Sequence, residues 1–473
     1  MPGPHLYVDL DGTLIATDLL HETALRLLRA SPLAMLRIPA WLLQGKAFLK
    51  QQVAQRVNID AAALPYRASV LAIIRHAREQ GRRVVLTTAS DRSLAASVAQ
   101  HLGVFDHVIA SDGVSNLSGQ RKLQAIRDDA AGHPFCYMAN ESIDLDVWQG
   151  AQAAVVVSNS PALRRKVRAA TTIEAEVDVP EASLRDLLYG IRVHQWLKNL
   201  LVFVPLLPML SELTESMVFG ALAMFFAFSA CASAVYVVND LLDLETDRQH
   251  HRKKGRPFAS GIIPIRQAIL LALALLMVAM LIALVALPPA AWAALAGYVA
   301  LTTAYSFWLK RKMLVDVFAL AALYTTRIVA GMAAAQVQTS LWLLGFSMFM
   351  FLSLALAKRY VEIGEVHDGS QVKGRAYAAS DAMFVLAAGM TAGQLSVLTL
   401  SLYLNDPQMA QRYAHPLVLW LLCPLLLYWL VRVWLKAHRH ELHDDPVVFA
   451  ARDHISRAIV IASVVLVYIA SWT

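Results

Sequence analysis

Long apolar segments recur from residue 185 to the end of the chain, and they limit its fold more than any other feature. We identify nine candidate membrane spans, at residues 194–211, 217–240, 264–287, 290–308, 314–335, 340–361, 380–403, 416–436 and 456–472. Several of them are long enough to cross a hydrocarbon core of about 30 Å as a helix. With 57% hydrophobic residues and a mean hydropathy of +0.49, the chain is too apolar to be wholly soluble. We therefore expect the second part of the chain to be a multi-pass membrane domain.

The loops between these spans alternate in charge. Those after the even-numbered spans are basic, as in DRQHHRKKGR and KRK, whereas those after the odd-numbered spans read LPPAAW or AQVQTS. The positive-inside rule places the basic loops in the cytoplasm. The start, MPGPHLYVDLDGT, lacks the pattern of a signal peptide, so we expect the front domain on the cytoplasmic side of the inner membrane. The net charge of +7 then favours anionic lipid or phosphate, and no nucleic acid, as the partner.

The stretch VVNDLLDLETDRQHHRKKGRPFASG, residues 237–261, concentrates charge at the end of the second span. On a continuous helix, Asp240, Asp243 and Asp247 share one face, with Asn239 beside them. Like charges at the end of a membrane helix are costly unless cations bind them. Open carboxylates suit Mg²⁺ that is shared with a diphosphate. The alternative is a solvated acidic helix end, balanced by the basic residues that follow.

The pattern NDxxDxxxD followed by GRPFASG resembles the first aspartate motif of the UbiA superfamily of intramembrane prenyltransferases, and YSFWLKRKMLVD (305–316) resembles its second conserved loop. The resemblance covers residues 185–473. It implies an all-α transmembrane bundle of nine helices with a Mg²⁺-bound diphosphate at the cytoplasmic end. In this reading Asp240 and Asp243 are catalytic, and together with Asp247 they hold the metal.

The end of the sixth span indicates which branch of the UbiA superfamily the chain resembles. This span ends in ALAKRYVEIGE, where aromatic prenyltransferases of the superfamily carry a second aspartate cluster. With RVHQWLKN (192–199), RIVAGMAA (327–334) and HDDPVVFAARD (443–453), this resembles the decaprenyl-phosphate phosphoribosyltransferase (DPPR synthase) branch, although Val193 stands where proline is usual. A lipid phosphate acceptor needs cations, and a neutral aromatic ring does not.

The candidate substrate-binding residues follow from this branch, and for the lysines among them the alternative role is snorkelling at helix ends. The set is Gln195, Lys198, Asn199, Asn239, Arg256, Tyr305, Lys310, Lys358, Arg359 and Glu362.

The front domain carries a second set of motifs. HLYVDLDGTL resembles motif I of the haloacid-dehalogenase (HAD) phosphatases, and RRVVLTTAS, GQRKLQAI and FCYMANESIDLDVW follow in family order. The resemblance implies an α/β, Rossmann-type doubly wound parallel sheet. We expect this domain at residues 1–160 with a helical insert at 19–80, a linker at 161–185 and the UbiA-type domain at 186–473. Within the insert, PLAMLRIPAWLLQG is either an interfacial element on the bilayer or a buried cap helix.

The HAD resemblance also assigns roles. Asp9 is the nucleophile and Asp11 the acid/base, while Thr88 and Lys122 hold the phosphoryl group. Mg²⁺ is bound by Asp9, the Asp11 carbonyl, Asn140 and Asp144. Because Asn140 replaces an acid, metal binding is weakened, and the alternative is a degenerate structural domain.

The two sets of motifs together indicate a bifunctional Mg²⁺-dependent enzyme. It would transfer 5-phosphoribose from 5-phosphoribosyl diphosphate to polyprenyl phosphate and then remove the 5-phosphate, giving a lipid-linked ribose for envelope glycans. One alternative is a UbiA prenyltransferase that uses an aromatic acceptor and carries a degenerate HAD domain. Another is a transporter or lipid-binding protein. Membrane lipid is a further expected partner, and a homo-oligomer is left open.

Overall fold

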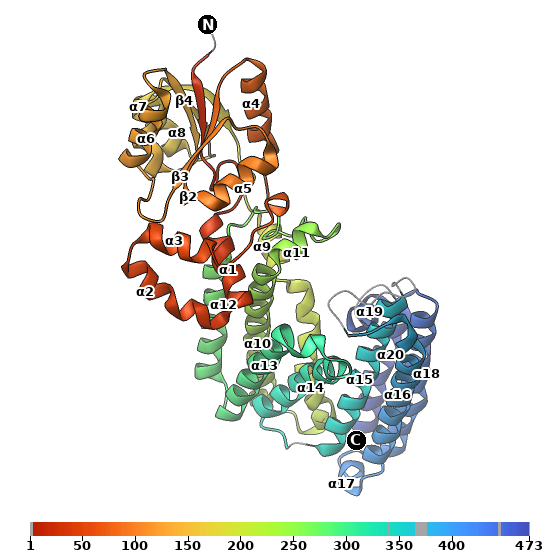
Figure 1. The fold of residues 1–473 in the computed structure, drawn as a ribbon. Helices are drawn as coiled ribbons and strands as arrows, with labels where there is room; N and C mark the ends of the chain where they lie inside the picture. Colours follow the sequence, from red (N-terminus) through yellow and green to blue (C-terminus); the bar gives the residue numbers. More distant parts are fainter. Residues whose placement is uncertain (1–2, 339, 365–375, 443–445, 473) are drawn as a thin grey trace. The chain divides into compact units, whose positions relative to one another are not determined.

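The computed structural model describes residues 3–338, 340–364, 376–442 and 446–472. It contains two compact units (Figure 1), Met1–Ile191 with Val237–Leu271 and Arg192–Tyr236 with Ala272–Thr473. The acidic stretch 237–261 therefore belongs to the same unit as the front domain. Part of the expected basic loop after the sixth span, and His443, Asp444 and Asp445 of HDDPVVFAARD, lie outside the described residues.

A six-stranded parallel sheet forms the centre of the front domain, in the order β3-β2-β1-β4-β5-β6. Its strands are β1 His5–Val8, β2 Val84–Asp91, β3 His107–Ser111, β4 Phe135–Ala139, β5 Ala153–Val157 and β6 Thr172–Val177. Successive residues of β1 alternate between the two faces, so Leu6 and Val8 join one core and Tyr7 the other. Both faces are covered, which is why β1, β4 and β5, in the middle of the sheet, are almost continuously apolar. The expected doubly wound sheet is confirmed.

Helices connect the strands and cover the two faces of this sheet (Figure 1). They are α4 Ala68–Glu79, α5 Arg92–Leu102, α6 Gln120–Ala130, α7 Leu145–Gly150 and α8 Pro161–Ala170, with a short turn, η3, at Ser142–Asp144. The expected linker at 161–185 is too long, because α8 and β6 occupy most of it and β6 pairs with β5. The strand was missed because TIEAEV alternates polar and apolar residues at an edge of the sheet.

The helical insert follows β1. It contains α1 Leu19–Ala30, η1 Pro32–Arg37, α2 Ile38–Leu43, α3 Lys46–Ala54 and η2 Ala61–Ala63. Asp18 caps α1 by accepting hydrogen bonds from the Leu20 and His21 amides. Leu27, Trp41, Leu49 and Val53 form a small core of their own. The insert ends earlier than residue 80, because α4 already leads into β2.

Nine long helices correspond to the nine expected spans. They are η4 Val193–Glu212, α10 Glu215–Leu242, α12 Ile265–Ala286, α13 Pro289–Phe307, α14 Val315–Ala335, α15 Leu341–Gly364, α16 Ala382–Leu404, α18 Leu422–His438 and α20 His454–Ser471. Within the described ranges, eight helices are long and apolar enough to cross a membrane. α13 falls short because its tryptophan, glycine, tyrosine, threonine and serine residues lower its mean hydropathy.

Shorter pieces connect the long helices: α9 Leu184–Gly190, α11 Leu244–Gln249, η5 Leu309–Arg311, η6 Ala379–Asp381, α17 Pro407–Ala410, η7 Pro416–Leu421 and α19 Pro446–Arg452. Small residues allow close packing between the long ones. A side chain at Gly331 would meet the Val202 carbonyl, and one at Gly220 would meet the Ala334 carbonyl.

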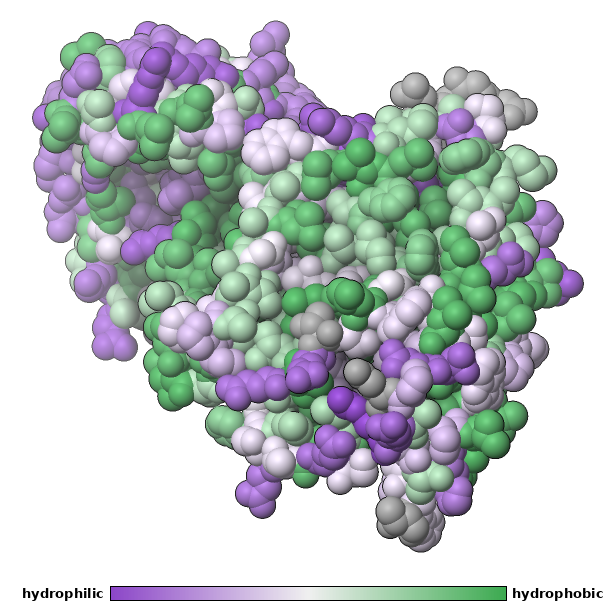
Figure 2. Space-filling model, turned by 90° about the horizontal axis from the view of Figure 1, so that it is seen from below, coloured by the Kyte–Doolittle hydropathy of each residue, from purple (hydrophilic) through white to green (hydrophobic). Residues whose placement is uncertain are grey.

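Outward-facing apolar side chains are common on the long helices, as the broad green areas of Figure 2 show. On α12, Met277, Leu281 and Val285 are spaced by four residues and are 66%, 63% and 79% exposed. A helix face of this kind is stable only in a hydrocarbon environment. The protein is therefore a multi-pass membrane protein with an all-α membrane domain.

Candidate active sites

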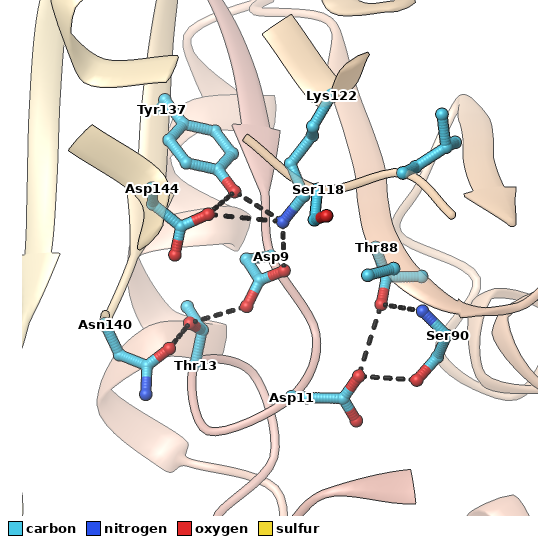
Figure 3. A network of polar contacts seen from close by, with 12 residues as sticks. Asp9, Asp11, Thr13, Thr88, Ser90, Ser118, Lys122, Tyr137, Asn140 and Asp144 are labelled. Atoms are coloured by element: carbon cyan, nitrogen blue, oxygen red, sulfur yellow. Dashed lines mark hydrogen bonds and ion pairs between the residues drawn. The ribbon is translucent and has the colours of Figure 1, made fainter. Parts of the chain in front are cut away.

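The predicted phosphatase residues meet at the carboxyl edge of the parallel sheet (Figure 3). Asp9 directly follows β1, Thr88 lies in β2 and Asn140 directly follows β4. Ligands of doubly wound sheets bind at this edge, where neighbouring strands end together. Asp9 is only 6% exposed, so its charge needs partners.

Lys122 of α6 supplies the main partner. Its ammonium group donates to Asp9 Oδ1 at 2.8 Å, to the Tyr137 hydroxyl at 2.9 Å and to Asp144 Oδ1 at 3.3 Å. Tyr137 in turn donates to Asp144 Oδ1 at 2.8 Å. Burial lowers the pKa of Lys122, but the two carboxylates outweigh burial and the net shift is upward. Lys122 therefore remains charged, where it can balance both Asp9 and a phosphoryl group.

Asp11 is held by three groups from two segments, α1 and β2. Oδ1 accepts the Leu19 amide of α1 at 2.8 Å, and Oδ2 accepts the hydroxyls of Ser90 at 2.5 Å and Thr88 at 3.3 Å. Burial raises the pKa of Asp11 to about 6 and that of Asp9 to about 7. A carboxyl group that gains and loses a proton near neutral pH is suited to acid/base work.

The oxygen donors for a metal converge on Thr13. Its hydroxyl lies 3.1 Å from Asp9 Oδ2 and 3.0 Å from Asn140 Oδ1. A carboxylate and an amide oxygen that meet at one hydroxyl, with the Asp11 carbonyl nearby in sequence, are the kinds of ligand that a hard cation such as Mg²⁺ prefers, with one charge fewer than an all-carboxylate set. Asp144, predicted as a fourth ligand, instead contacts Lys122 and Tyr137. In the described part of the chain, no three Asp, Glu, His or Cys side chains form a metal cluster.

Sequence reasoning assigned no role to four residues of this site: Thr13, which belongs to the first motif, and Lys50, Ser90 and Tyr137. Thr13 and Ser90 lie within two residues of predicted ones, so the motifs did contain a signal for them. Lys50 comes from the insert helix α3, and it donates to the Ala89 carbonyl at 2.6 Å, beside Thr88. Burial lowers the pKa of Lys50. Nothing in the sequence indicates that this lysine reaches the phosphatase site.

The acidic motif is interrupted where we expected a continuous helix. α10 ends at Leu242, Asp243 precedes α11 with a non-helical φ of −102°, and Asp247 lies within α11. Asp240 and Asp247 still come together, because Arg256 Nη1 lies 3.0 Å from Asp240 Oδ1 and 2.6 Å from Asp247 Oδ2. Two carboxylates that converge on one cationic atom fit a divalent cation.

Asp243 faces the phosphatase domain instead. Its Oδ1 lies 3.0 Å from Nη1 of Arg29, in the last turn of α1, and the same nitrogen donates to the Leu242 carbonyl at 3.0 Å. The expectation that all three acids share one face is therefore wrong.

Two further ion pairs join α1 to the acidic stretch. Arg26 contacts Glu245 at 2.5 Å, and Glu22 contacts Arg248 at 2.6 Å. The Glu22–Arg248 pair is buried, with side chains 6% and 8% exposed. Sequence reasoning missed this contact, because the partners lie in separate motif regions with no pattern that links them.

The second unit contains several predicted substrate-binding residues. Asn199 of η4 is buried, donating to Ser229 at 2.9 Å and accepting from Arg327 Nε at 2.9 Å. Lys198 Nζ lies 5.6 Å from the centre of the Tyr324 ring. Arg327, from the RIVAGMAA stretch, is 4% exposed and stacks on aromatic rings, although we had assigned it no role.

Arg359 of α15 is fully buried. Its Nη2 lies 3.0 Å from Oδ2 of Asp316, whose Oδ1 accepts the Tyr377 hydroxyl at 2.6 Å. It also contacts Glu362. These bonds give Arg359 a structural partner in the helix bundle, so any role in substrate binding stays a prediction.

The remaining predicted residues of the second unit are partly exposed: Gln195 in η4, Tyr305 in the last turn of α13, Lys310 in η5, and Lys358 in α15. Asn239, Asp240, Asp243, Asp247 and Arg256 belong to the first unit. That the two sets serve one substrate stays a prediction.

Comparisons with known proteins match both parts of the chain. The profile of the UbiA prenyltransferase family matches residues 202–456, and that of the haloacid dehalogenase-like hydrolases matches residues 6–162. An uncharacterized protein of Sinorhizobium fredii, y4nM, is 39% identical over 459 residues, which cover 95% of this chain and 88% of the relative.

Two other matches are partial. The decaprenyl-phosphate phosphoribosyltransferase of Corynebacterium glutamicum is 33% identical over 188 residues, 39% of this chain and 57% of that protein. A UbiA homolog from Archaeoglobus fulgidus, solved with GPP and Mg²⁺, is 14% identical with a TM-score of 0.47, and the match covers 60% of this chain and 99% of the homolog.

Proposed function

The chain belongs to the UbiA prenyltransferase family and carries an N-terminal HAD-like domain, and from this premise we propose that it makes a lipid-linked ribose in two steps. The first step transfers 5-phosphoribose from 5-phosphoribosyl diphosphate to polyprenyl phosphate. The second step removes the 5-phosphate. The convergence of Asp240 and Asp247 on the cationic Arg256 carries the first assignment, and the partial match to decaprenyl-phosphate phosphoribosyltransferase supports the choice of substrates.

In the transfer step, an oxygen of the lipid phosphate forms a bond to C1 of the ribose, while the bond from C1 to the diphosphate breaks. The acceptor oxygen is already anionic, so no strong base is needed. The chain has to hold two anionic substrates together and stabilise the leaving group. We assign Asp240 and Asp247, whose carboxylates converge on Arg256, to hold Mg²⁺, which would neutralise charge on the departing diphosphate. That Asp243, which pairs with Arg29, also binds the metal stays a prediction.

We assign cationic side chains to the remaining negative charges of the two substrates. Arg256, with Nη1 between Asp240 and Asp247, stands beside the place where the diphosphate would lie. Lys198 and Lys358 are partly exposed side chains, and we assign them to the acceptor phosphate. Gln195, Tyr305 and Lys310 complete the proposed binding set. Arg359 forms a buried ion pair with Asp316, so we assign it to hold α15 in place.

In the second step Asp9 attacks the 5-phosphate, and Asp11 donates a proton to the departing ribose oxygen. Water then releases orthophosphate from Asp9, and Asp11 takes the proton from that water. The hydrogen bonds from Leu19, Ser90 and Thr88 orient Asp11 for both transfers. Lys122 balances charge on Asp9 and the phosphoryl group. Asp9, the Asp11 carbonyl and Asn140 would hold Mg²⁺, which screens the phosphate oxygens from the attacking carboxylate.

We propose that both sites work on the cytoplasmic side of the inner membrane. The product, polyprenylphosphoryl ribose, would serve envelope glycan synthesis as a lipid-linked pentose. Arg29 and Asp243 support a joint action of the two domains, since their ion pair joins α1 of the phosphatase to the aspartate motif.

The deciding experiment uses the purified full-length protein with Mg²⁺, labelled 5-phosphoribosyl diphosphate and polyprenyl phosphate. Resolution of the extracted lipids should show a labelled product that lacks the 5-phosphate. A parallel reaction with a prenyl diphosphate and 4-hydroxybenzoate tests the aromatic-acceptor alternative. Prenylation of the aromatic acid without ribosyl transfer would select that alternative.

A further inference from the structure

Four leucines of the helical insert point away from the protein. Leu33, Leu36, Leu42 and Leu43, here called the leucine face, are 78%, 77%, 49% and 90% exposed. The same short helices turn Met35, Ile38 and Trp41 inward to the small core of the insert. The leucine face is therefore the outer side of a packed element. Clustered exposed apolar side chains of this kind mark an interaction site.

The ion pairs of α1 join the insert to the end of α10. α10 has 28 residues and is about 42 Å long, which exceeds a hydrocarbon core of about 30 Å. Because its last turn also carries the charged Asp240, we expect Leu242, its last residue, at the level of the lipid head groups. Arg29 of α1 donates to the Leu242 carbonyl and pairs with Asp243, so the end of α1 lies at that level too.

The short chain segment between Arg29 and Leu33 keeps the leucine face close to Arg29. Leu33 follows Arg29 by four residues, so their Cα atoms are at most about 14 Å apart. The segment from Ser31 to Lys46, SPLAMLRIPAWLLQGK, contains no acidic residue, and its two cations, Arg37 and Lys46, are exposed. Leucines flanked by cations suit a surface of anionic phospholipids.

We propose that the leucine face lies in the phospholipid leaflet at the Leu242 end of α10 and anchors the phosphatase domain to the bilayer. α3 follows this face directly and carries Lys50 to the Ala89 carbonyl in the phosphatase site. The insert thus connects the lipid surface with the site that, in the proposed function, receives a lipid-linked phosphate. The anchoring itself does not depend on that function.

The test uses the full-length protein in vesicles of phosphatidylcholine and phosphatidylglycerol. Cys423, the one native cysteine of the three that is partly accessible, is replaced by alanine, and a single cysteine is introduced as Leu36→Cys or Leu43→Cys. Each is labelled with an environment-sensitive fluorophore. Glu79→Cys is the matched control, because Glu79 of α4 is 76% exposed and lies outside the insert.

Lipids brominated on the acyl chain should quench the label at residues 36 and 43 at least twofold and leave the label at residue 79 unchanged. Aqueous iodide should give the reverse order. Equal iodide quenching at all three positions would show that the face is solvated and would overturn the proposal. A label shielded from iodide but not quenched by brominated lipid would show that protein covers the face, which would overturn it as well.

Discussion

Arg29 of the phosphatase domain and Asp243 of the acidic motif form an ion pair of 3.0 Å, although their motifs belong to different families. Its side chains are 40% and 36% exposed, whereas the neighbouring Glu22–Arg248 pair is almost fully buried. The same contact between α1 and residues 242–248 therefore contains one screened pair and one that is shielded from solvent.

The two pairs should differ in their effect on stability. Arg29→Ala should lower the free energy of unfolding by roughly 0.2–1 kcal/mol, because solvent screens the pair. Glu22→Ala leaves the buried Arg248 without its charge partner and should cost about 3–5 kcal/mol. Thermal unfolding of the purified protein in detergent measures both, with the exposed Glu79→Ala as the control. Equal losses in the two variants would contradict the burial of the Glu22 pair.

The metal-binding role assigned to the acidic motif predicts how substitutions in it change the rate of ribosyl transfer. Asp240→Ala or Asp243→Ala should reduce ribosyl transfer at least about 100-fold with folding intact, because a metal-held leaving group contributes several kcal/mol to the transition state. Glu245→Ala is the matched control, since Glu245 lies in the same stretch and pairs with Arg26. Turnover like that of the unmodified protein in either aspartate variant would remove the metal assignment.

Asp9→Asn separates the two steps. The amide is nearly isosteric but is a very poor nucleophile, so the variant should accumulate the 5-phosphorylated lipid while the membrane step continues. The unmodified protein should yield a product lighter by one phosphate. Mass spectrometry of the extracted lipids distinguishes the two outcomes. If both proteins stop at the phosphorylated lipid, the HAD-like domain is a scaffold.

Asn140→Asp should strengthen Mg²⁺ binding at the phosphatase site. The Asn140 oxygen lies 3.0 Å from the Thr13 hydroxyl, which also contacts Asp9, so a carboxylate there would add a charge to the same oxygen set. The Mg²⁺ concentration needed for half-maximal phosphate release should fall. An unchanged Mg²⁺ requirement would show that Asn140 is not a ligand.

Substitution of Arg359 distinguishes a structural role of this side chain from a role in substrate binding. Arg359→Met removes the ion pair that Arg359 forms with the buried Asp316 and should cost about 3–5 kcal/mol of stability, and the added change Asp316→Leu should recover much of it. Thermal unfolding with and without 5-phosphoribosyl diphosphate provides the measurement. A variant of normal stability that has lost only its response to the substrate would support the substrate role instead.

The parts of these sites that follow one another in sequence could be predicted, and the parts that meet only in the folded chain could not. Asp9, Asp11 and Thr13 follow one strand, so their place at the sheet edge follows from the fold. Lys50 reaches the same edge from the insert, and no periodicity indicates that. Helical spacing put Asp243 on one face with its neighbours, but the break before α11 turns it toward Arg29.

The membrane part shows the same limit. Apolar length predicted the bounds of the nine long helices to within three residues, except at the start of α18, because a bilayer requires such segments. The partners of Arg327 and Arg359 come from helices that are distant in sequence, so the packing of the bundle had to be known first. Near the domain boundary, an edge strand with alternating polar residues was read as linker.

α1 contacts Asp11 through the Leu19 amide at its first residue and Asp243 through Arg29 in its last turn. Fission of the gene between the two domains would therefore not give two independent products. The released phosphatase would carry Glu22 without its countercharge, and the membrane product would expose Arg248 in the same way. The fused gene thus has a physical reason to stay fused, and relatives with separate genes should have replaced both residues of this pair.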